Sequence, residues 1–221
     1  TIRVDPADGV TPVQSVKPLV RTRGYEMGVR SEPLAGWQST LSLWQLTAAS
    51  ELLFVGDAGT TEASRPSRRY GVEWTNLYVL ADWLAIDADL AWSHARFRDH
   101  DPLVGDYIPG AVSTTANIGI TLDHLGPWFG SLRLRYFGPR PLIEDNTVRS
   151  ASSALTNLRV GYRLAPRTQL ALDVYNLFDR KVNDIEYWYD SQLPSESAAV
   201  LDRHVHPTEP RSFRLTLTYR F

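Results

Sequence analysis

The 221-residue sequence has no cysteine, which excludes disulfides, thiolate metal sites and cysteine nucleophiles. It also has no apolar run of the ~18 residues that a transmembrane helix needs. Residues 1–20 lack the basic and apolar regions of a signal peptide. Positive charge is not in excess, because the formal net charge is -2. We therefore expect no nucleic-acid partner.

Aromatic residues, in contrast, are plentiful, with 7 Trp, 10 Tyr and 7 Phe. The last ten residues, SFRLTLTYRF, alternate strictly between polar side chains and aromatic or aliphatic ones. In an extended strand, one face would carry Phe213, Leu215, Leu217, Tyr219 and Phe221. Such a strand fits a half-buried strand of a soluble sandwich, or a stave of a membrane barrel with its apolar face toward lipid.

The same alternation recurs along the chain and predicts nine strands. They lie at about residues 22–32, 37–49, 68–81, 84–98, 112–123, 131–136, 157–164, 169–174 and 212–221. Residues 1–21 are predicted to be loop or a short edge strand, because they hold three prolines and show no sustained period.

Connections between these strands alternate in length. Short turns lie near residues 33, 82, 124 and 165, and long loops at about 50–67, 99–110, 139–151 and 181–211. Most strands are ~10–15 residues long, whereas globular strands average ~5–6 and a tilted bilayer crossing needs ~9–11. The pattern predicts an all-β, antiparallel, up-and-down transmembrane β-barrel, with short periplasmic turns and long extracellular loops. A soluble all-β fold is the alternative.

One face of the predicted strands is charged. Asp87 and Asp89 share a face of one strand, and burying them unpaired would cost several kcal/mol, so that face should be wet. In a porin this face would line a channel, and in a receptor it would face a plug domain and water. The predicted lumen-facing residues are Asp87, Asp89, Arg133, Arg135, Arg159, Arg163, Asp173 and Arg214.

A resemblance to a known family lies near the end of the chain. Residues 173–181 read DVYNLFDRK, and the chain ends in HPTEPRSFRLTLTYRF. This combination resembles the carboxy-terminal region of TonB-dependent outer-membrane receptors, in which an N-L-F-D-(K/R)-x-Y segment precedes the last loop. The matching residues are Asn176, Leu177, Phe178, Asp179 and Arg180, whereas Val182 stands where the family usually has Tyr. The resemblance covers residues 22–221.

The resemblance implies a function for the chain as part of a larger protein. Barrels of this family have ~22 strands around a plug, so nine strands would form an open fragment that lacks the plug and an amino-terminal TonB box. The expected location is the outer membrane of a Gram-negative bacterium. The expected activity is uptake of a scarce ligand, an iron–siderophore chelate or a similar one, energised by the TonB–ExbB–ExbD complex acting on the plug.

Further partners are implied in the same way. The terminal strand, from Phe213 to Phe221, resembles the signal that engages the barrel-assembly machinery. Outer-membrane lipid and the remaining barrel and plug are also expected partners, and no cofactor or catalytic residue is expected. The alternatives are a passive porin, an autotransporter barrel and a soluble β-sandwich binding module.

The 181–211 loop holds the candidate ligand contacts. Tyr187, Trp188 and Tyr189 could stack on an aromatic chelator, with loop packing as the alternative role. His204 and His206 would point the same way from a strand and could share a metal, but a loop pair of this kind is more often solvated. We therefore predict no metal site.

An enzyme is also not predicted. Asp99, His100 and Asp101 cluster in a loop with no placed nucleophile. Ser93 and His94 are neighbours in a predicted strand and so point to opposite faces.

Overall fold

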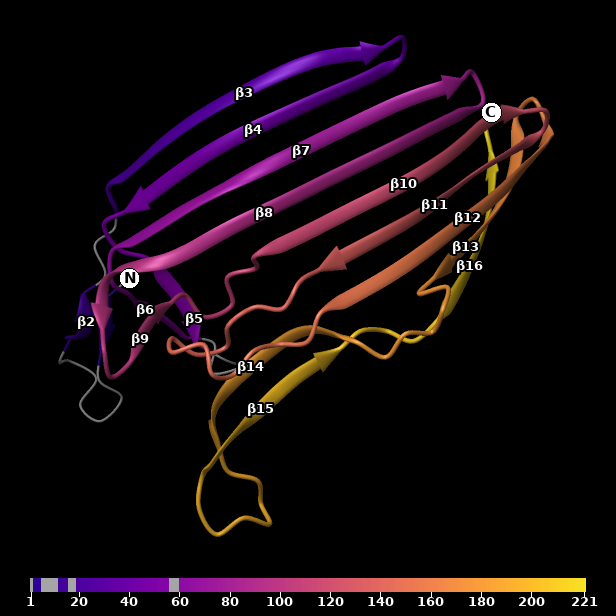
Figure 1. Cartoon of the computed structure of the whole chain (residues 1–221). Coiled ribbons are helices and arrows are strands. Elements are labelled where there is room, and N and C mark those ends of the chain that lie inside the picture. Colours follow the sequence, from indigo (N-terminus) through magenta and orange to yellow (C-terminus); the bar gives the residue numbers. More distant parts are fainter. Residues whose placement is uncertain (1, 5–11, 16–18, 56–59) are drawn as a thin grey trace.

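The computed structural model describes residues 2–4, 12–15, 19–55 and 60–221, and their regular structure is entirely β-strand. Within these ranges, no helix has the length and apolar character to span a membrane. Nine long strands run side by side in one curved antiparallel sheet (Figure 1). The long strands are β3 (Thr22–Leu34), β4 (Trp37–Ala48), β7 (Ser67–Ala81), β8 (Leu84–Asp101), β10 (Thr114–Leu125), β11 (Trp128–Phe137), β12 (Ser153–Ala165), β13 (Thr168–Tyr175) and β16 (Ser212–Tyr219).

Each long strand pairs with the next long strand along the chain, in the order β3-β4-β7-β8-β10-β11-β12-β13-β16. A short strand, β9 (Gly105–Tyr107), pairs with the end of β8. The edges of the sheet are β3 and β16. The predicted fold class, an up-and-down antiparallel sheet of about nine strands that is open rather than closed, is confirmed.

Short turns join the strands at one end of the sheet, at residues 35–36, 82–83, 126–127 and 166–167. Gly36 has a φ of +78°, a conformation that glycine adopts without strain, and a Cβ atom there would lie 2.6 Å from Val79 O. Pro33 was expected to end the first strand, but β3 continues to Leu34. The pairing of β3 with β4 shifts between Ser31 and Leu34, and such an irregularity tolerates a proline.

The opposite end carries long connections, and small hairpins lie within them. The stretch 50–67 contains β5 (Leu52–Val55) paired with β6 (Thr60–Ala63), and 181–211 contains β14 (Asn183–Ser191) paired with β15 (Val200–Pro207). In the first 21 residues, β1 (Ile2–Val4) pairs with β2 (Pro12–Ser15). The β14–β15 hairpin projects away from the sheet (Figure 1). We call this end of the sheet the loop end.

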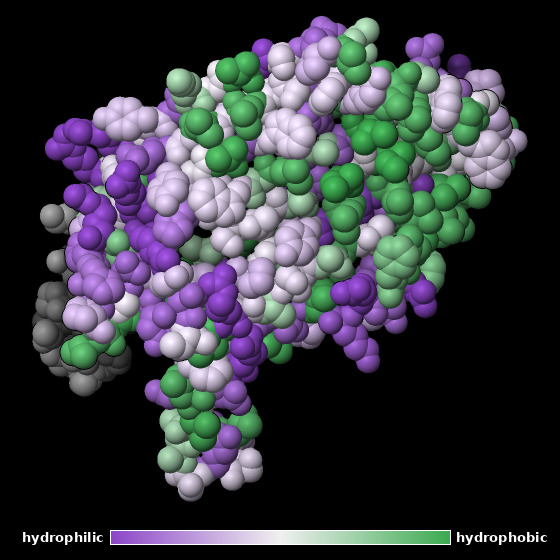
Figure 2. All heavy atoms as spheres, viewed as in Figure 1, coloured by the Kyte–Doolittle hydropathy of each residue, from purple (hydrophilic) through white to green (hydrophobic). Residues whose placement is uncertain are grey.

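The two faces of the sheet differ in polarity. Register places Val29, Leu41 and Trp74 on one face, which we call the outer face, and the same face carries the apolar side chains of β16. These side chains are not packed into a core, since Leu215 is 69% exposed. Figure 2 shows apolar residues gathered toward the turn end and hydrophilic ones toward the loop end. An apolar exposed surface on this scale suits a lipid environment.

Candidate ligand-binding site at the loop end

Ion pairs cross the inner face of the sheet. Arg133 Nη1 and Nη2 donate to Asp87 Oδ2 and Oδ1 at 3.0 and 3.2 Å. The pair spans two strand spacings, from β8 over β10 to β11, and passes above Gly119. A Cβ atom at Gly119 would lie 2.5 Å from Asp87 Oδ1. The glycine therefore leaves the space through which the two side chains meet.

A second pair joins neighbouring strands of the same face. Arg159 Nε and Nη2 donate to Asp173 Oδ1 and Oδ2 at 2.6 and 2.9 Å, and Arg214 stands opposite Asp173 on β16. Nearer the turn end, Arg163 pairs with Asp123. Asp89 is exposed on this face, opposite Asn117, and makes no ion pair with a described residue. Register thus places all eight predicted lumen residues on the inner face.

A cavity of about 1290 Å³ opens at the loop end. Its lining combines residues from β14, from the 139–151 connection, from the stretch between the end of β8 and the start of β10, and from the segments around β5 and β6. Three arginines, three aromatic residues of β14, six carboxylates and several apolar side chains contribute. The arginines and aromatic residues are Arg65, Arg69, Arg140, Tyr187, Trp188 and Tyr189, and the carboxylates belong to Glu51, Asp101, Glu144, Asp145, Asp184 and Glu186.

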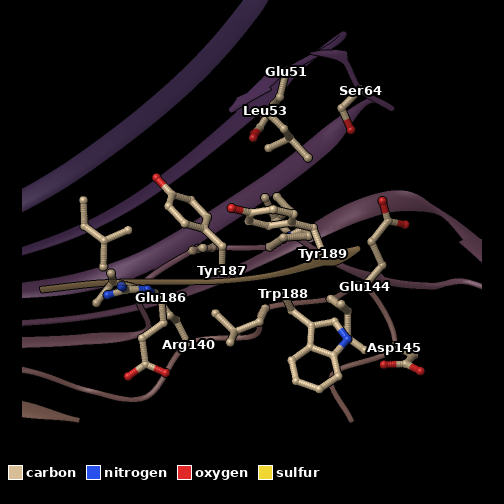
Figure 3. Close-up of a pocket in the computed structure, with 18 of the residues that line it drawn as sticks. Glu51, Leu53, Ser64, Arg140, Glu144, Asp145, Glu186, Tyr187, Trp188 and Tyr189 are labelled. Atoms are coloured by element: carbon tan, nitrogen blue, oxygen red, sulfur yellow. The ribbon is translucent and has the colours of Figure 1, made fainter. Parts of the chain in front are cut away.

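The three aromatic residues of β14 do not form one surface. Tyr187 and Tyr189 point to the side where Glu51 and Leu53 lie, whereas Trp188 points to the opposite side (Figure 3). This is the alternation that a strand imposes on successive side chains. Because residues 181–211 were predicted to be a loop, the sequence analysis identified the aromatic cluster but not the division of its side chains between two faces of a strand.

Glu186 anchors the β14–β15 hairpin to the main sheet. Its carboxylate is 4% exposed and pairs with Arg203 on β15. It also accepts hydrogen bonds from Ala151 N and Asn183 Nδ2, both at 3.2 Å. Because Ala151 precedes β12, one carboxylate ties the hairpin to the sheet. Burial of this acid is compensated by three donors.

A second contact to the hairpin involves Asp184. Its carboxylate accepts from Arg135 Nη2 at 3.3 Å, and its backbone carbonyl accepts from Arg140 Nη2 at 3.1 Å. Arg135, a predicted lumen residue, therefore pairs with the hairpin rather than with another strand of the sheet. The cavity and the inner face are joined through this residue.

Ion pairs also surround the cavity from the β5–β6 side. Arg65 pairs with Glu144, and Arg65 Nη2 donates to Gly105 O at 2.8 Å. Glu51 accepts from Arg69 Nε at 3.0 Å and from Ser67 Oγ. Burial opposes ionisation of the Glu51 carboxyl, but the hydrogen bonds from Arg69 and Ser67 and the charge of Arg69 outweigh it, so the pKa of Glu51 lies below its usual value.

The two predicted histidines lie on β15, outside the cavity lining. The His204 ring stacks on the Tyr189 ring, with centroids 3.7 Å apart and an interplanar angle of 14°. His206 meets the Tyr187 ring edge-on at 6.3 Å. In the described part of the chain, no three His, Cys, Asp or Glu side chains are grouped so that they could hold a metal ion.

The NLFDR motif forms the tight turn that follows β13. Asn176 is buried with a φ of +50°, and its side chain bonds to Arg180 N at 2.9 Å, Arg180 O at 3.0 Å and Glu209 O at 3.1 Å. Asp179 accepts from Arg211 N at 2.9 Å. Leu177 is half-buried and Phe178 is exposed. The motif joins the end of β13 to the segment before β16, which is a structural role.

Several residues of the site were not identified by the sequence analysis. Arg65, Arg140 and Glu144 were not singled out because each lies in a polar connection with no period of its own. Glu186 was noted only as an acidic neighbour of the predicted aromatic cluster, not as the anchor of a hairpin. Their meeting depends on how three separate loops approach each other. The only available signal was that these connections share one end of the predicted barrel.

Comparison with known proteins extends these observations. A family model described as "TonB dependent receptor-like, beta-barrel" matches residues 6–177. No curated protein has a matching sequence. Among solved structures, the closed form of the ferric-catecholate import receptor Fiu from E. coli K12 aligns with a TM-score of 0.68 at 20% identity, over 91% of this chain and 28% of Fiu.

Two further structures are similar. The copper transporter OprC aligns with a TM-score of 0.71 at 19% identity, over 100% of this chain and 35% of OprC. The ferric yersiniabactin uptake receptor FyuA from Yersinia pestis aligns with a TM-score of 0.70 at 20% identity, over 91% of this chain and 30% of FyuA. The chain thus spans 28% to 35% of the length of these three proteins. At such identities the likeness concerns the fold.

Proposed function

Because the chain belongs to the TonB-dependent receptor-like β-barrel family, we propose that it forms part of the wall of an outer-membrane receptor in a Gram-negative bacterium. The receptor takes up a scarce ligand, an iron–siderophore complex or a similar metal chelate. The TonB–ExbB–ExbD complex supplies the energy through a plug domain, and the barrel-assembly machinery inserts the barrel. The chain has no catalytic role and no cofactor in this proposal.

The loop-end cavity is the observation that carries the proposal. Its volume, about 1290 Å³, exceeds the ~300–1,000 Å³ of pockets for drug-sized ligands, so a bulky chelate fits it. Tyr187 and Tyr189 offer aromatic faces for stacking, and Arg140 offers a cation. The lining mixes three arginines with six carboxylates, and together with the aromatic faces it suits a chelate that has aromatic parts and both hydrogen-bond donors and acceptors.

The polar inner face of the sheet is consistent with a barrel lumen through which a ligand passes. Asp87–Arg133 and Arg159–Asp173 are exchangeable polar pairs on a surface that, in a closed barrel, faces the plug and water. In this proposal they exchange hydrogen bonds with the plug as it is remodelled. The outer face, including Phe213, Leu215, Leu217, Tyr219 and Phe221, contacts lipid.

The test is growth and uptake in the producing bacterium. The gene is deleted, and growth is compared on catecholate, hydroxamate and citrate complexes as single iron sources. We expect loss of growth on one class, restored by the wild-type gene. The Tyr187→Ala/Tyr189→Ala variant should lower uptake of that chelate roughly tenfold, because each stacked ring contributes ~0.5–1.5 kcal/mol.

Phe178→Ala is the matched control, since Phe178 is an exposed aromatic residue near the loop end and does not line the cavity. Uptake by this variant should stay at the wild-type level. In a separate experiment, uptake by the wild-type protein should disappear in a strain without TonB. Continued uptake without TonB would indicate a passive porin. Growth on every iron source after deletion would contradict the choice of ligand.

A further inference from the structure

A row of arginines crosses the outer face near the loop end. Register places Arg23 on β3 and Arg68 on β7 opposite the same residue of β4, Thr47. Arg96 on β8 stands opposite Arg68. Because side chains alternate along a strand, Arg98 shares this face with Arg96. Three of four consecutive strands of the sheet, β3, β7 and β8, therefore place guanidinium groups on the surface that otherwise faces lipid, and β4 between them carries Thr47 at this level.

Aromatic rings lie directly beneath this row, toward the turn end. Tyr25 and Tyr70 are two residues along their strands from Arg23 and Arg68. The Tyr70 and Trp92 rings meet edge-on with centroids 6.1 Å apart, and they are 40% and 46% exposed. Exposed Tyr and Trp rings of this kind mark the interface between the apolar band and the headgroups.

The arginine row lies at the outer edge of the apolar band. On the turn side, the band is bounded by Trp37 and Tyr78, whose rings are 6.1 Å apart. From Tyr78 to Arg68 the chain rises ~33 Å along β7, at ~3.3 Å per residue. With a strand tilt of ~40°, the height is ~25 Å, which matches the apolar band of outer-membrane barrels. The guanidinium groups therefore stand at headgroup level.

A groove of about 480 Å³ lies in the outer face below the arginines. Its lining includes Met27, Leu43 and Val72 at its apolar part, with Arg68 at its upper end. The groove is continuous with the lipid-facing surface, and its width spans the strands that carry Arg23 and Arg68.

Of the four arginines in this row, Arg96 has a carboxylate partner, because its Nη1 lies 3.5 Å from Asp106 Oδ1. No carboxylate of a described residue pairs with Arg23, Arg68 or Arg98, and all three are exposed. Arg68 Nη2 donates to the neutral Gln45 Oε1 at 2.7 Å. This differs from the inner face, where Arg133, Arg159 and Arg163 each pair with an aspartate. The outer row thus has positive charge available for an external anion.

We propose that this corner binds one phosphate-bearing membrane lipid. Its headgroup phosphate lies between Arg23 and Arg68, with Arg98 at the side, and an acyl chain occupies the groove. Arg23 and Arg68 are two strand spacings apart, ~9.6 Å, so their long side chains can converge on one phosphate. A lipid is chosen over free phosphate because the anion site and the apolar groove adjoin.

The test uses the complete protein, purified from membranes and reconstituted in phosphatidylcholine vesicles. The vesicles contain a small fraction of either brominated phosphatidic acid or brominated phosphatidylcholine, and bromine quenches nearby tryptophan. Trp92 lines the groove, so the quenching that is lost in Trp92→Phe is the quenching by lipid bound in the groove. We expect wild-type protein to prefer phosphatidic acid. Arg23→Gln/Arg68→Gln should lower this preference roughly fivefold per arginine.

Arg30→Gln/Arg167→Gln is the matched control, because it removes the same charge from the inner face of β3 and from a turn. It should keep the preference for phosphatidic acid. Arg68→Lys, which keeps the charge but not the planar fork, should give an intermediate loss. All variants must first show heat-modifiable migration, which reports a folded barrel.

Three results would overturn the proposal. Equal quenching by both lipids would mean that the arginines only extend to the interface without binding a particular headgroup. An unchanged preference in Arg23→Gln/Arg68→Gln would place the site elsewhere. Removal of the preference by inorganic phosphate would show that free phosphate, not lipid, occupies the site. Native mass spectrometry of retained phosphatidic acid gives an independent measure of the same loss.

Discussion

Gly119 shows how one missing side chain determines an interaction between two others. The Asp87 and Arg133 side chains meet across the intervening strand only because position 119 carries no Cβ atom. Arg133 is 55% exposed in this pair, so the ion pair itself contributes little to stability. Its value lies in fixing where each charge points on the inner face.

We predict that Gly119→Ala destabilises the barrel by about 1 kcal/mol, because the new methyl group displaces the Asp87 carboxylate. The measurement is the midpoint of thermal or denaturant unfolding in detergent. Gly24→Ala is the control, since a Cβ atom there would meet its nearest heavy atom at an ordinary 3.6 Å. In an Asp87→Ala background, Gly119→Ala should lose most of its effect. Equal effects in both backgrounds would contradict the explanation.

At the scale of elements, the β14–β15 hairpin is held by a few polar contacts. Glu186 provides the buried anchor, and Asp184 adds contacts to Arg135 and Arg140. Among the strands that the structure describes, none of the main sheet pairs with β14 or β15. Its position over the cavity therefore depends on single side chains.

We predict that Glu186→Gln loosens the hairpin without unfolding the sheet. The substitution removes the charge that Arg203 requires and weakens the acceptor for Ala151 N, at a cost of about 1–3 kcal/mol. Hydrogen exchange should rise at residues 183–191 and at Ala151, with the long strands unchanged. Glu196→Gln, at the exposed hairpin tip, should leave exchange at Ala151 unaffected. Faster exchange throughout the sheet would show that Glu186 supports the whole barrel instead.

The sequence predicts the long strands well and the short ones poorly. Strands such as β8 carry many alternating pairs, so their period is visible without any partner. Strands such as β5 have 4 residues, too few for a period to stand out from a polar loop. The hairpin strands β14 and β15 were missed because aromatic and charged residues occupy both of their faces.

Cross-strand partners were beyond the reach of the sequence. It predicts that Asp87 and Arg133 face inward, but they are 46 residues apart and meet only through the register of three strands. Arg135 had an equally visible charge, yet its partner is Asp184 in the hairpin. Facing direction follows from local alternation, whereas pairing follows from the turns and bulges that set the register.

At the scale of the whole molecule, polarity is arranged opposite to that of a soluble protein. Large apolar side chains cover the outer face, and the charged pairs lie on the inner one. Few apolar residues of the described chain are buried. Stability therefore depends on the solvent that meets the outer face.

We predict that two neighbouring substitutions on β16 differ strongly in their effect on stability. Leu215→Arg places a charge on the outer face and should cost about 2–4 kcal/mol of membrane-inserted stability. Thr216→Arg places the same charge on the inner face, opposite Ala171, and should change stability by about 0.5 kcal/mol or less. The measurements are refolding into lipid vesicles and abundance in the outer-membrane fraction. Equal tolerance of both would contradict the assignment of faces.

The tip of the β14–β15 hairpin, residues 192–199, is largely exposed and stands clear of the sheet (Figure 1). Exposed loop tips of this kind accept inserted peptides with little loss of fold. If the long loops are extracellular, as the sequence predicts, an epitope inserted after Ser197 would be accessible to an antibody on intact bacteria. Antibody labelling of this hairpin would then measure the amount of the protein on the surface of single intact cells.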